Sequence, residues 1–260
     1  MPESALLHRI RDNQALRRVA ARFDRRFPWH LLYRGDRLEC PCCGGHFRGF
    51  RARDGRPDAR CPGCNSFERH RVLWMWMRDR AGVFEERLDV LHIAPETVFE
   101  SRMRALANLR YTGGDLFPRG EQVRVDLTDI PFDAGSFDLV ICNHVRDEIP
   151  DDRLALREIH RVLRPGGRLV TQTAVHLDQE STFEDPSLSA EERRRVFGTV
   201  DDVRIYGRDF AGRLAEPGFD VTRIDHVAEL DPATVERHAL REQGGIANGS
   251  DIYVAVKSPA

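Results

Sequence analysis

The sequence has 260 residues, of which 41% are hydrophobic and 32% charged, with a formal net charge of −2 at pH 7. This length allows one full α/β domain plus a smaller module. No apolar run approaches the roughly 20 residues that a membrane span needs, and the N-terminus lacks a signal-peptide core. We therefore expect a cytoplasmic protein without a membrane segment.

The positive charge is concentrated near the N-terminus. Residues 1–80 contain 18 arginines against 9 acidic residues, a balance that could attract phosphate-bearing partners. However, Lys257 is the only lysine, so arginine carries most of the basic solvation, and no basic run with interleaved aromatics marks a nucleic-acid surface. A small-molecule substrate is therefore favoured over RNA.

From Ser4 to Phe27, apolar residues recur at three- and four-residue intervals, which predicts an amphipathic helix that Pro28 ends. A cysteine-rich segment follows. Two C-x2-C pairs, separated by 17 residues, fit the spacing of a tetrahedral zinc site with no exchangeable ligand. The predicted ligands of this structural zinc are Cys40, Cys43, Cys61 and Cys64. Cys42 and His46 are left over, with His46 in place of one cysteine as an alternative.

Asn65 and Glu68 form a capping-box pattern, which predicts a helix to about Arg80. Its centre, Val72–Met77, is apolar on all sides, so we expect it to lie between the zinc module and the main domain. The predicted domains are residues 1–84, with the N-terminal helix, zinc module and docking helix, and residues 85–260.

Strands and helices alternate after residue 85, which predicts an α/β fold with a parallel, doubly wound sheet. Residues 176–206 interrupt the alternation and are expected to form a lid or recognition insertion. The predicted strands are 89–94, 111–116, 123–126, 137–142, 168–173, 219–224 and 252–257, the last two antiparallel. The predicted helices are 97–108, capped by Thr97 with Glu100, 151–163, and one from the 203–210 segment to about 215.

The run Phe137–Cys142 is almost wholly apolar and reads as a strand buried on both faces. Asn143 and His144 follow at once. Ligands of open α/β sheets bind outside the carboxyl ends of the strands, so these two side chains are candidate site residues.

The segment D-x-x-x-x-P-F at 126–132, the S-F-D segment at 136–138 and R-V-L-R-P-G-G-R-L-V at 161–170 resemble class I S-adenosylmethionine-dependent methyltransferases over about residues 85–257. More narrowly, two C-P-x-C knuckles, L-H-I-A-P-E, I-C-N-H-V with I-P-D-D, and V-R-I-Y-G-R-D-F resemble a bacterial subgroup with a zinc knuckle. The resemblance implies a Rossmann-like seven-stranded sheet with a small N-terminal helical and zinc-ribbon module, S-adenosylmethionine as cofactor and methyl transfer as the activity.

The first strand departs from that family. His92 stands at the usual acidic position, and Ala94 and Glu96 stand where the family has glycines, which tolerate positive φ and close approach. Either Glu96 pairs with the methionine ammonium group of a cofactor held slightly differently, or the domain has lost cofactor binding.

The resemblance carries other roles over by position. It implies ribose binding by Asp115 with Leu116, adenine binding by Asp126 with Leu127, and Asn143 and His144 beside the transferable methyl. His144 is a candidate general base, because its ordinary pKa near 6.5 lets it accept a proton near neutral pH. A structural hydrogen-bonding role is the alternative.

Two arginines and one tyrosine, Arg146, Arg208 and Tyr206, are predicted to contact the substrate. Arg146 begins an R-D-E segment where the subgroup tends to read L-E-H. Tyr206 and Arg208 are expected to open the helix after the insertion and to bind an anionic substrate. The leading function is methyl transfer to a small-molecule or natural-product nucleophile. The alternatives are an RNA methyltransferase that docks RNA on its basic zinc module, and a non-catalytic binding protein.

Overall fold

The computed structural model describes residues 28–53, 55–241 and 247–259. The predicted helix over 4–27 lies outside the described residues. None of the helices in these ranges is long and apolar enough to cross a membrane.

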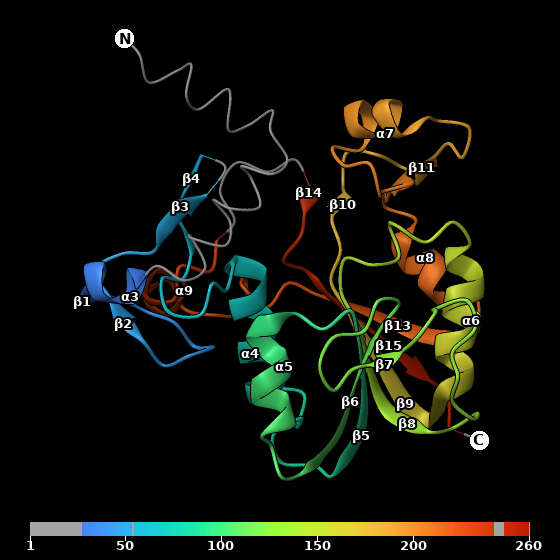
Figure 1. Cartoon of the computed structure of the whole chain (residues 1–260), viewed down its shortest axis with the longest axis horizontal. Coiled ribbons are helices and arrows are strands. Elements are labelled where there is room, and N and C mark those ends of the chain that lie inside the picture. Colours follow the sequence, from blue (N-terminus) through green and yellow to red (C-terminus); the bar gives the residue numbers. More distant parts are fainter. Residues whose placement is uncertain (1–27, 54, 242–246, 260) are drawn as a thin grey trace.

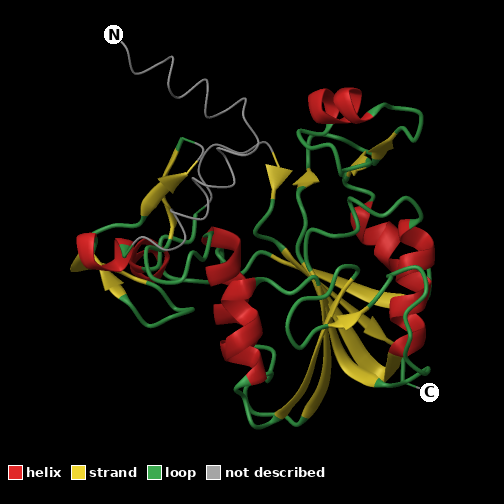
Figure 2. Ribbon diagram, viewed as in Figure 1, coloured by secondary structure: helices red, strands yellow, loops and turns green. Residues whose placement is uncertain are grey.

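A seven-stranded sheet forms the centre of the molecule (Figures 1 and 2), with strand order β13-β15-β9-β8-β5-β6-β7. Neighbours from β9 to β7 pair in parallel, and β15 pairs antiparallel with both β9 and β13. The predicted seven-stranded, mainly parallel sheet is therefore confirmed. Its strands are β5 (Leu88–Ile93), β6 (Leu109–Asp115), β7 (Val123–Arg124), β8 (Phe137–Cys142), β9 (Leu163–Thr171), β13 (Phe219–Ile224) and β15 (Ile252–Lys257).

Helices cover both faces of this sheet (Figure 1). On one face lie α4 (Glu68–Asp79) and α5 (Thr97–Arg104), and on the other lie α6 (Asp152–Val162) and α8 (Phe210–Ala215). Each face has its own apolar core, because the side chains of a central parallel strand alternate between the two faces. On β8, Leu139 and Ile141 belong to the first core, whereas Val140 and Cys142 belong to the second.

The cysteine-rich module packs on the α4 face and shares its core. Buried residues of the module, among them Phe47 and Phe50, belong to the same apolar cluster as the centre of α4 and the sheet residue Val90. The predicted burial of Val72–Met77 is confirmed, since each of these side chains is at most 7% exposed. The module contains α3 (Trp29–Leu32), β1 (Arg34–Glu39), β2 (His46–Phe47), β3 (Arg51–Arg53) and β4 (Arg56–Arg60), and α9 (Pro232–Arg237) lies against β1.

The insertion forms small paired strands and one short helix near the carboxyl ends of the sheet strands (Figure 1). Strand β10 pairs with β14 and β11 with β12, in both cases antiparallel. The insertion contains β10 (Val175–His176), β11 (Phe183–Glu184), α7 (Ala190–Val196) and β12 (Arg204–Ile205), whereas β14 (Ala247–Asn248) comes from the segment before β15.

Three predictions about helix ends are wrong. Helix α4 begins at Glu68, and Asn65 instead takes φ +63° in the second cysteine knuckle, at the position that Gly44 occupies with φ +66° in the first. Asparagine tolerates this left-handed conformation better than most residues. Asn65 therefore forms the turn of the knuckle and does not cap the helix. Helix α5 has Glu96 rather than Thr97 at its N-cap and ends at Arg104. Finally, 204–205 form a strand, and α8 begins only at Phe210.

Candidate active site at the carboxyl ends of β5 and β8

A hydrogen-bonded group of polar side chains lies where β5 and β8 end. His92 Nε2 is 2.8 Å from Glu96 Oε2, and Asn143 Nδ2 donates to Glu96 Oε1 at 3.0 Å. The Tyr111 hydroxyl lies 3.0 Å from His92 Nδ1. The structure therefore brings together the three predicted site residues His92 on β5, Glu96 at the N-cap of α5 and Asn143 directly after β8.

Glu96 is ionised in this setting. Burial alone would raise the pKa of its carboxyl, but the hydrogen bond and electrostatic interaction with His92 outweigh burial and lower the pKa to about 2. Each carboxylate oxygen accepts one of the two hydrogen bonds described, although a carboxylate offers about four acceptor positions. The side chain remains 19% exposed. Glu96 can thus accept further hydrogen bonds from a cationic ligand group.

The turn after β5 has the backbone shape that glycine usually provides. Ala94 takes φ +44°, and its N–H donates to the carbonyl of Gly114 on β6 at 2.7 Å. A non-glycine residue in this region costs of order 1 kcal/mol, and such strain is concentrated at functional sites. The turn therefore forms without a glycine, because Ala94 adopts the positive φ that glycine usually provides.

The two residues after β8 are fixed by the end of β9. Asn143 Oδ1 accepts the N–H of Gln172 at 2.9 Å, and the His144 N–H donates to the Gln172 carbonyl at 2.9 Å. His144 takes φ +47°, and its buried Nε2 has no hydrogen-bond partner. Burial, together with the charge of Arg69, lowers the pKa of His144 to about 4. His144 is therefore neutral at pH 7 and a weaker base than an ordinary histidine.

The residues predicted to bind the adenosine part lie along the next strands. Asp115 ends β6 half-buried, and its Oδ1 accepts the N–H of Phe117 at 2.8 Å. Asp126 is exposed and accepts hydrogen bonds from the backbone and side chain of Thr128, which lower its pKa. Leu127 is buried, whereas Leu116 is 42% exposed. These positions are compatible with the predicted roles but do not test them.

Two of the three predicted substrate residues lie together, since the Arg146 guanidinium carbon is 5.8 Å from the centre of the Tyr206 ring. Arg146 is buried; its Nη2 donates to Thr171 Oγ1 at 3.2 Å, while Nε and Nη1 have no partner. Tyr206 is also buried, and its hydroxyl donates to Asp152 Oδ2 at 3.0 Å. Arg208 is exposed. Tyr206 thus joins a buried ion network of the insertion, so its hydroxyl is already used within the protein.

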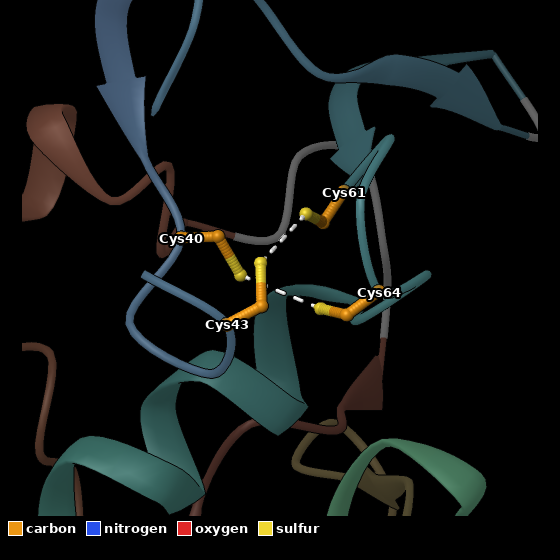
Figure 3. Close-up of side chains that lie close together, drawn as sticks. All are labelled: Cys40, Cys43, Cys61 and Cys64. Atoms are coloured by element: carbon orange, nitrogen blue, oxygen red, sulfur yellow. Dashed lines mark hydrogen bonds between the residues drawn. The ribbon is translucent and has the colours of Figure 1, made fainter. Parts of the chain in front are cut away.

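The four predicted zinc ligands form one cluster. Their sulfur atoms lie within 4.8 Å of one another and come from two separate knuckles, as Figure 3 shows. The Cys40–Cys64 and Cys43–Cys61 sulfur pairs are 3.6 and 3.8 Å apart. Four thiolates placed tetrahedrally at about 2.3 Å from a zinc ion would be about 3.8 Å apart. The cluster therefore has the size that zinc requires.

The spare residues of this segment do not join the cluster. The Cys42 thiol donates to the carbonyl of His70 at 3.7 Å, and His46 pairs with Asp36 outside the cluster. The knuckle backbone supports the sulfurs, since the Gly63 N–H donates to Cys61 Sγ at 3.3 Å. Among the residues that the structure describes, this cysteine set is the only group with metal-ligand geometry.

Sequence reasoning missed two residues of the site. His70, on the first turn of α4, packs its ring 5.5 Å from the ring of Phe99, which in turn lies 6.3 Å from the ring of His92. Tyr111 contacts His92 from β6. His70 comes from the segment that follows the second knuckle, so no local pattern pointed to the site. Tyr111 occupies an ordinary strand position.

The strand order with one antiparallel strand is that of the Rossmann-like class I methyltransferase fold, and the carboxylate after β5 and the polar residues after β8 lie at the carboxyl ends of its parallel strands. Residues 96–171 match the family model described as "Methyltransferase domain". The fold is similar to that of an S-adenosylmethionine-dependent methyltransferase from Mesorhizobium loti, with a TM-score of 0.50 and 16% identity over 72% of this chain and 98% of that one. The [4+2]-cyclase SpnF has the same fold likeness, with a TM-score of 0.50 and 17% identity over 82% of this chain and 87% of that one.

Curated relatives match over shorter segments. A demethylmenaquinone methyltransferase from Clavibacter sepedonicus is 40% identical over 72 residues, which are 28% of this chain and 28% of the relative. An arsenite methyltransferase from Aquipseudomonas alcaligenes is 30% identical over 124 residues, or 47% of this chain and 33% of the relative. The match thus spans a third or less of these two relatives.

Proposed function

We propose that this protein transfers a methyl group from S-adenosylmethionine to a small-molecule nucleophile. The observation that carries the proposal is the ionised Glu96, held by His92 and Asn143 at the carboxyl ends of adjacent parallel strands within a methyltransferase domain. Relatives whose names refer to demethylmenaquinone and arsenite support a small acceptor.

The residues present fit the cofactor. Glu96 has acceptor positions to spare for the methionine ammonium group, which compensates for the missing acidic residue at His92. Asp115 ends β6 with one carboxylate oxygen bonded to backbone, so the other could accept from the ribose hydroxyls. Asp126 and Leu127 would bind the adenine. Asn143, locked between Glu96 and Gln172, would border the methionine part.

When bound, the cofactor supplies an electrophilic methyl group on a sulfonium. The chain contributes mainly by holding the nucleophile in line with that methyl. His144 is neutral at pH 7 and can accept a proton at Nε2, but its lowered pKa makes it suited to acceptors that ionise easily. Arg146 has two guanidinium nitrogens, Nε and Nη1, without a hydrogen-bond partner, which would suit an acceptor with an anionic group.

The decisive experiment is calorimetric titration with S-adenosylmethionine and S-adenosylhomocysteine. We expect both to bind the wild type, and Glu96→Gln to bind about 10- to 100-fold more weakly because an ion pair is lost. Glu100→Gln is the matched control, since Glu100 lies one turn further along α5 and bonds Gln122 and Arg104. Failure of the wild type to bind at millimolar concentration would overturn the proposal.

We also propose that Cys40, Cys43, Cys61 and Cys64 hold one structural zinc ion. The supporting observation is the sulfur geometry described above. Protein purified without chelator should contain about one equivalent of zinc, and Cys64→Ser should lose most of it, whereas Cys42→Ser should retain it. Less than half an equivalent in the wild type would contradict the proposal.

A further inference from the structure

His70 lies on α4, the helix that directly follows the second cysteine knuckle, and it reaches the side of the sheet where Glu96 lies. Its side chain is buried and packs edge-to-face on Phe99. Phe99 lies in the first turn of α5, where its N–H donates to the carbonyl of the N-cap residue Glu96 at 2.8 Å. His70 is therefore a residue of the zinc module segment that contributes to the candidate active site.

The protonation of this ring is fixed by its neighbours. The backbone N–H of Phe67 donates to His70 Nδ1 at 3.1 Å, so Nδ1 must be the unprotonated acceptor. Burial, with the charge of Arg69, lowers the pKa of His70 to about 3, so the ring is neutral at pH 7. The ring proton then resides on Nε2.

His70 Nε2 has no hydrogen-bond partner, although it is buried. Leaving a buried donor without an acceptor costs about 1–3 kcal/mol, so native proteins rarely do so without a functional reason. The ring that carries this free N–H packs on the first turn of α5, whose N-cap is Glu96, the residue proposed to pair with the ammonium group of the cofactor. In an amino acid, the ammonium and carboxylate groups are attached to the same carbon, so a donor near the ammonium site is well placed for the carboxylate.

We propose that His70 Nε2–H donates a hydrogen bond to the methionine carboxylate of S-adenosylmethionine, so that the helix of the zinc module completes the cofactor site. This inference rests on the proposed function, because it requires that the cofactor bind. A neutral donor suits this place, since it bonds the carboxylate without competing for the negative charge of Glu96.

The position of the ring depends on the knuckle. The neighbouring Arg71 donates to the carbonyls of Ala59 and Ser66, and the Cys42 thiol donates to the carbonyl of His70 itself. The start of α4 is thus tied to the second knuckle and to Cys42. The zinc module therefore contributes to ligand binding by fixing the place of one donor.

The test compares S-adenosylmethionine with its decarboxylated form, which keeps the ammonium group and lacks only the carboxylate. Wild-type protein should bind the intact cofactor about 10- to 100-fold more tightly, the value of a hydrogen bond to a charged group. His70→Asn keeps an acceptor near the Nδ1 position for the Phe67 N–H and removes the Nε2 donor. It should bind both forms equally, with its affinity for the decarboxylated form unchanged.

Two further variants make the result specific. His70→Gln places an amide N–H near the original Nε2 and should restore part of the preference for the intact cofactor. His226→Asn is the matched control, because His226 is a buried histidine with an unpartnered Nε2 that lies in the segment after β13, where its Nδ1 is 3.1 Å from Glu229 Oε2. It should leave the preference unchanged.

The outcomes separate the two proposals. If the wild type binds neither form, the proposed function fails. If the wild type binds the intact cofactor and His70→Asn keeps the wild-type preference, or weakens both forms equally, the role of His70 is overturned while the proposed function stands. Thermal unfolding of each variant shows whether it folds. If His70→Asn does not fold, the preference of His70→Gln for the intact cofactor decides the test.

Discussion

Arg71→Met should strongly destabilise the protein, because Arg71 joins the cysteine knuckles to the segment after α9. Its guanidinium is fully buried and donates to five backbone carbonyls. These carbonyls belong to Asp58, Ala59, Ser66, His238 and Ala239. It also lies 4.7 Å over the ring of Phe50. Methionine keeps most of the apolar stem and removes every donor.

The magnitude follows from the acceptors. Ser66 keeps one donor, since its carbonyl also accepts the N–H of Cys61 at 2.9 Å. At about 1 kcal/mol for each carbonyl that loses its donor, the remaining four cost roughly 4 kcal/mol. Part of this is offset, because burial of the charge is itself unfavourable and lowers the pKa of Arg71. We expect a net loss of about 2–4 kcal/mol.

Urea unfolding of zinc-loaded protein, followed by tryptophan fluorescence, measures this change, because Trp74 and Trp76 are buried on α4. The control is Arg78→Met on the same helix, whose exposed guanidinium pairs with the neighbouring Asp79. Its effect should be below about 0.5 kcal/mol. A loss for Arg71→Met of less than about 1 kcal/mol would refute the reasoning.

Two further predictions concern acid stability and the insertion. The pKa values of His70 and His144 are lowered to about 3 and 4, so their contribution to stability is complete above the unfolded pKa near 6.5 and is lost as pH falls toward 4. The urea concentration at the unfolding midpoint should fall when the pH is lowered from 7 to 5. It should fall less in a variant with both histidines changed to Asn. A midpoint that stays constant in the wild type would contradict this prediction. Asp152→Ala should cost about 3–5 kcal/mol, because it leaves Arg213 and Tyr206 buried without their carboxylate partner. It should also speed trypsin cleavage within 176–206, with Asp185→Ala as the control, and cleavage at the wild-type rate would count against it.

Elements with strong local signals were predicted well from the sequence. The run Phe137–Cys142 is a strand with the predicted bounds, because a short apolar run between a turn and polar residues has one stable place in an α/β fold. Helix α6 begins after Asp151, whose side chain accepts the N–H of Leu154 as an N-cap. The four cysteines cluster as their spacing predicted.

Features that depend on distant partners could not be predicted. The 203–210 segment was predicted to begin a helix, but Arg204 is held in a strand by Glu184 and by backbone carbonyls more than 50 residues away in the sequence. His70 reaches the site only because α4 packs on the sheet, and Arg71 bonds carbonyls 167 and 168 positions further along the chain. Periodicity carries no information about such contacts, since tertiary packing decides them.

The place of β15 has a consequence for folding kinetics. This strand, Ile252–Lys257, lies between β9 and β13, and it hydrogen-bonds both. Until it is inserted, the β9 edge of the parallel strands is unpaired and β13 has no neighbour in the sheet. Pairings of such long sequence separation form slowly and leave strand edges open to other chains. During synthesis, the nascent chain is therefore most prone to aggregate in the interval before these six residues emerge.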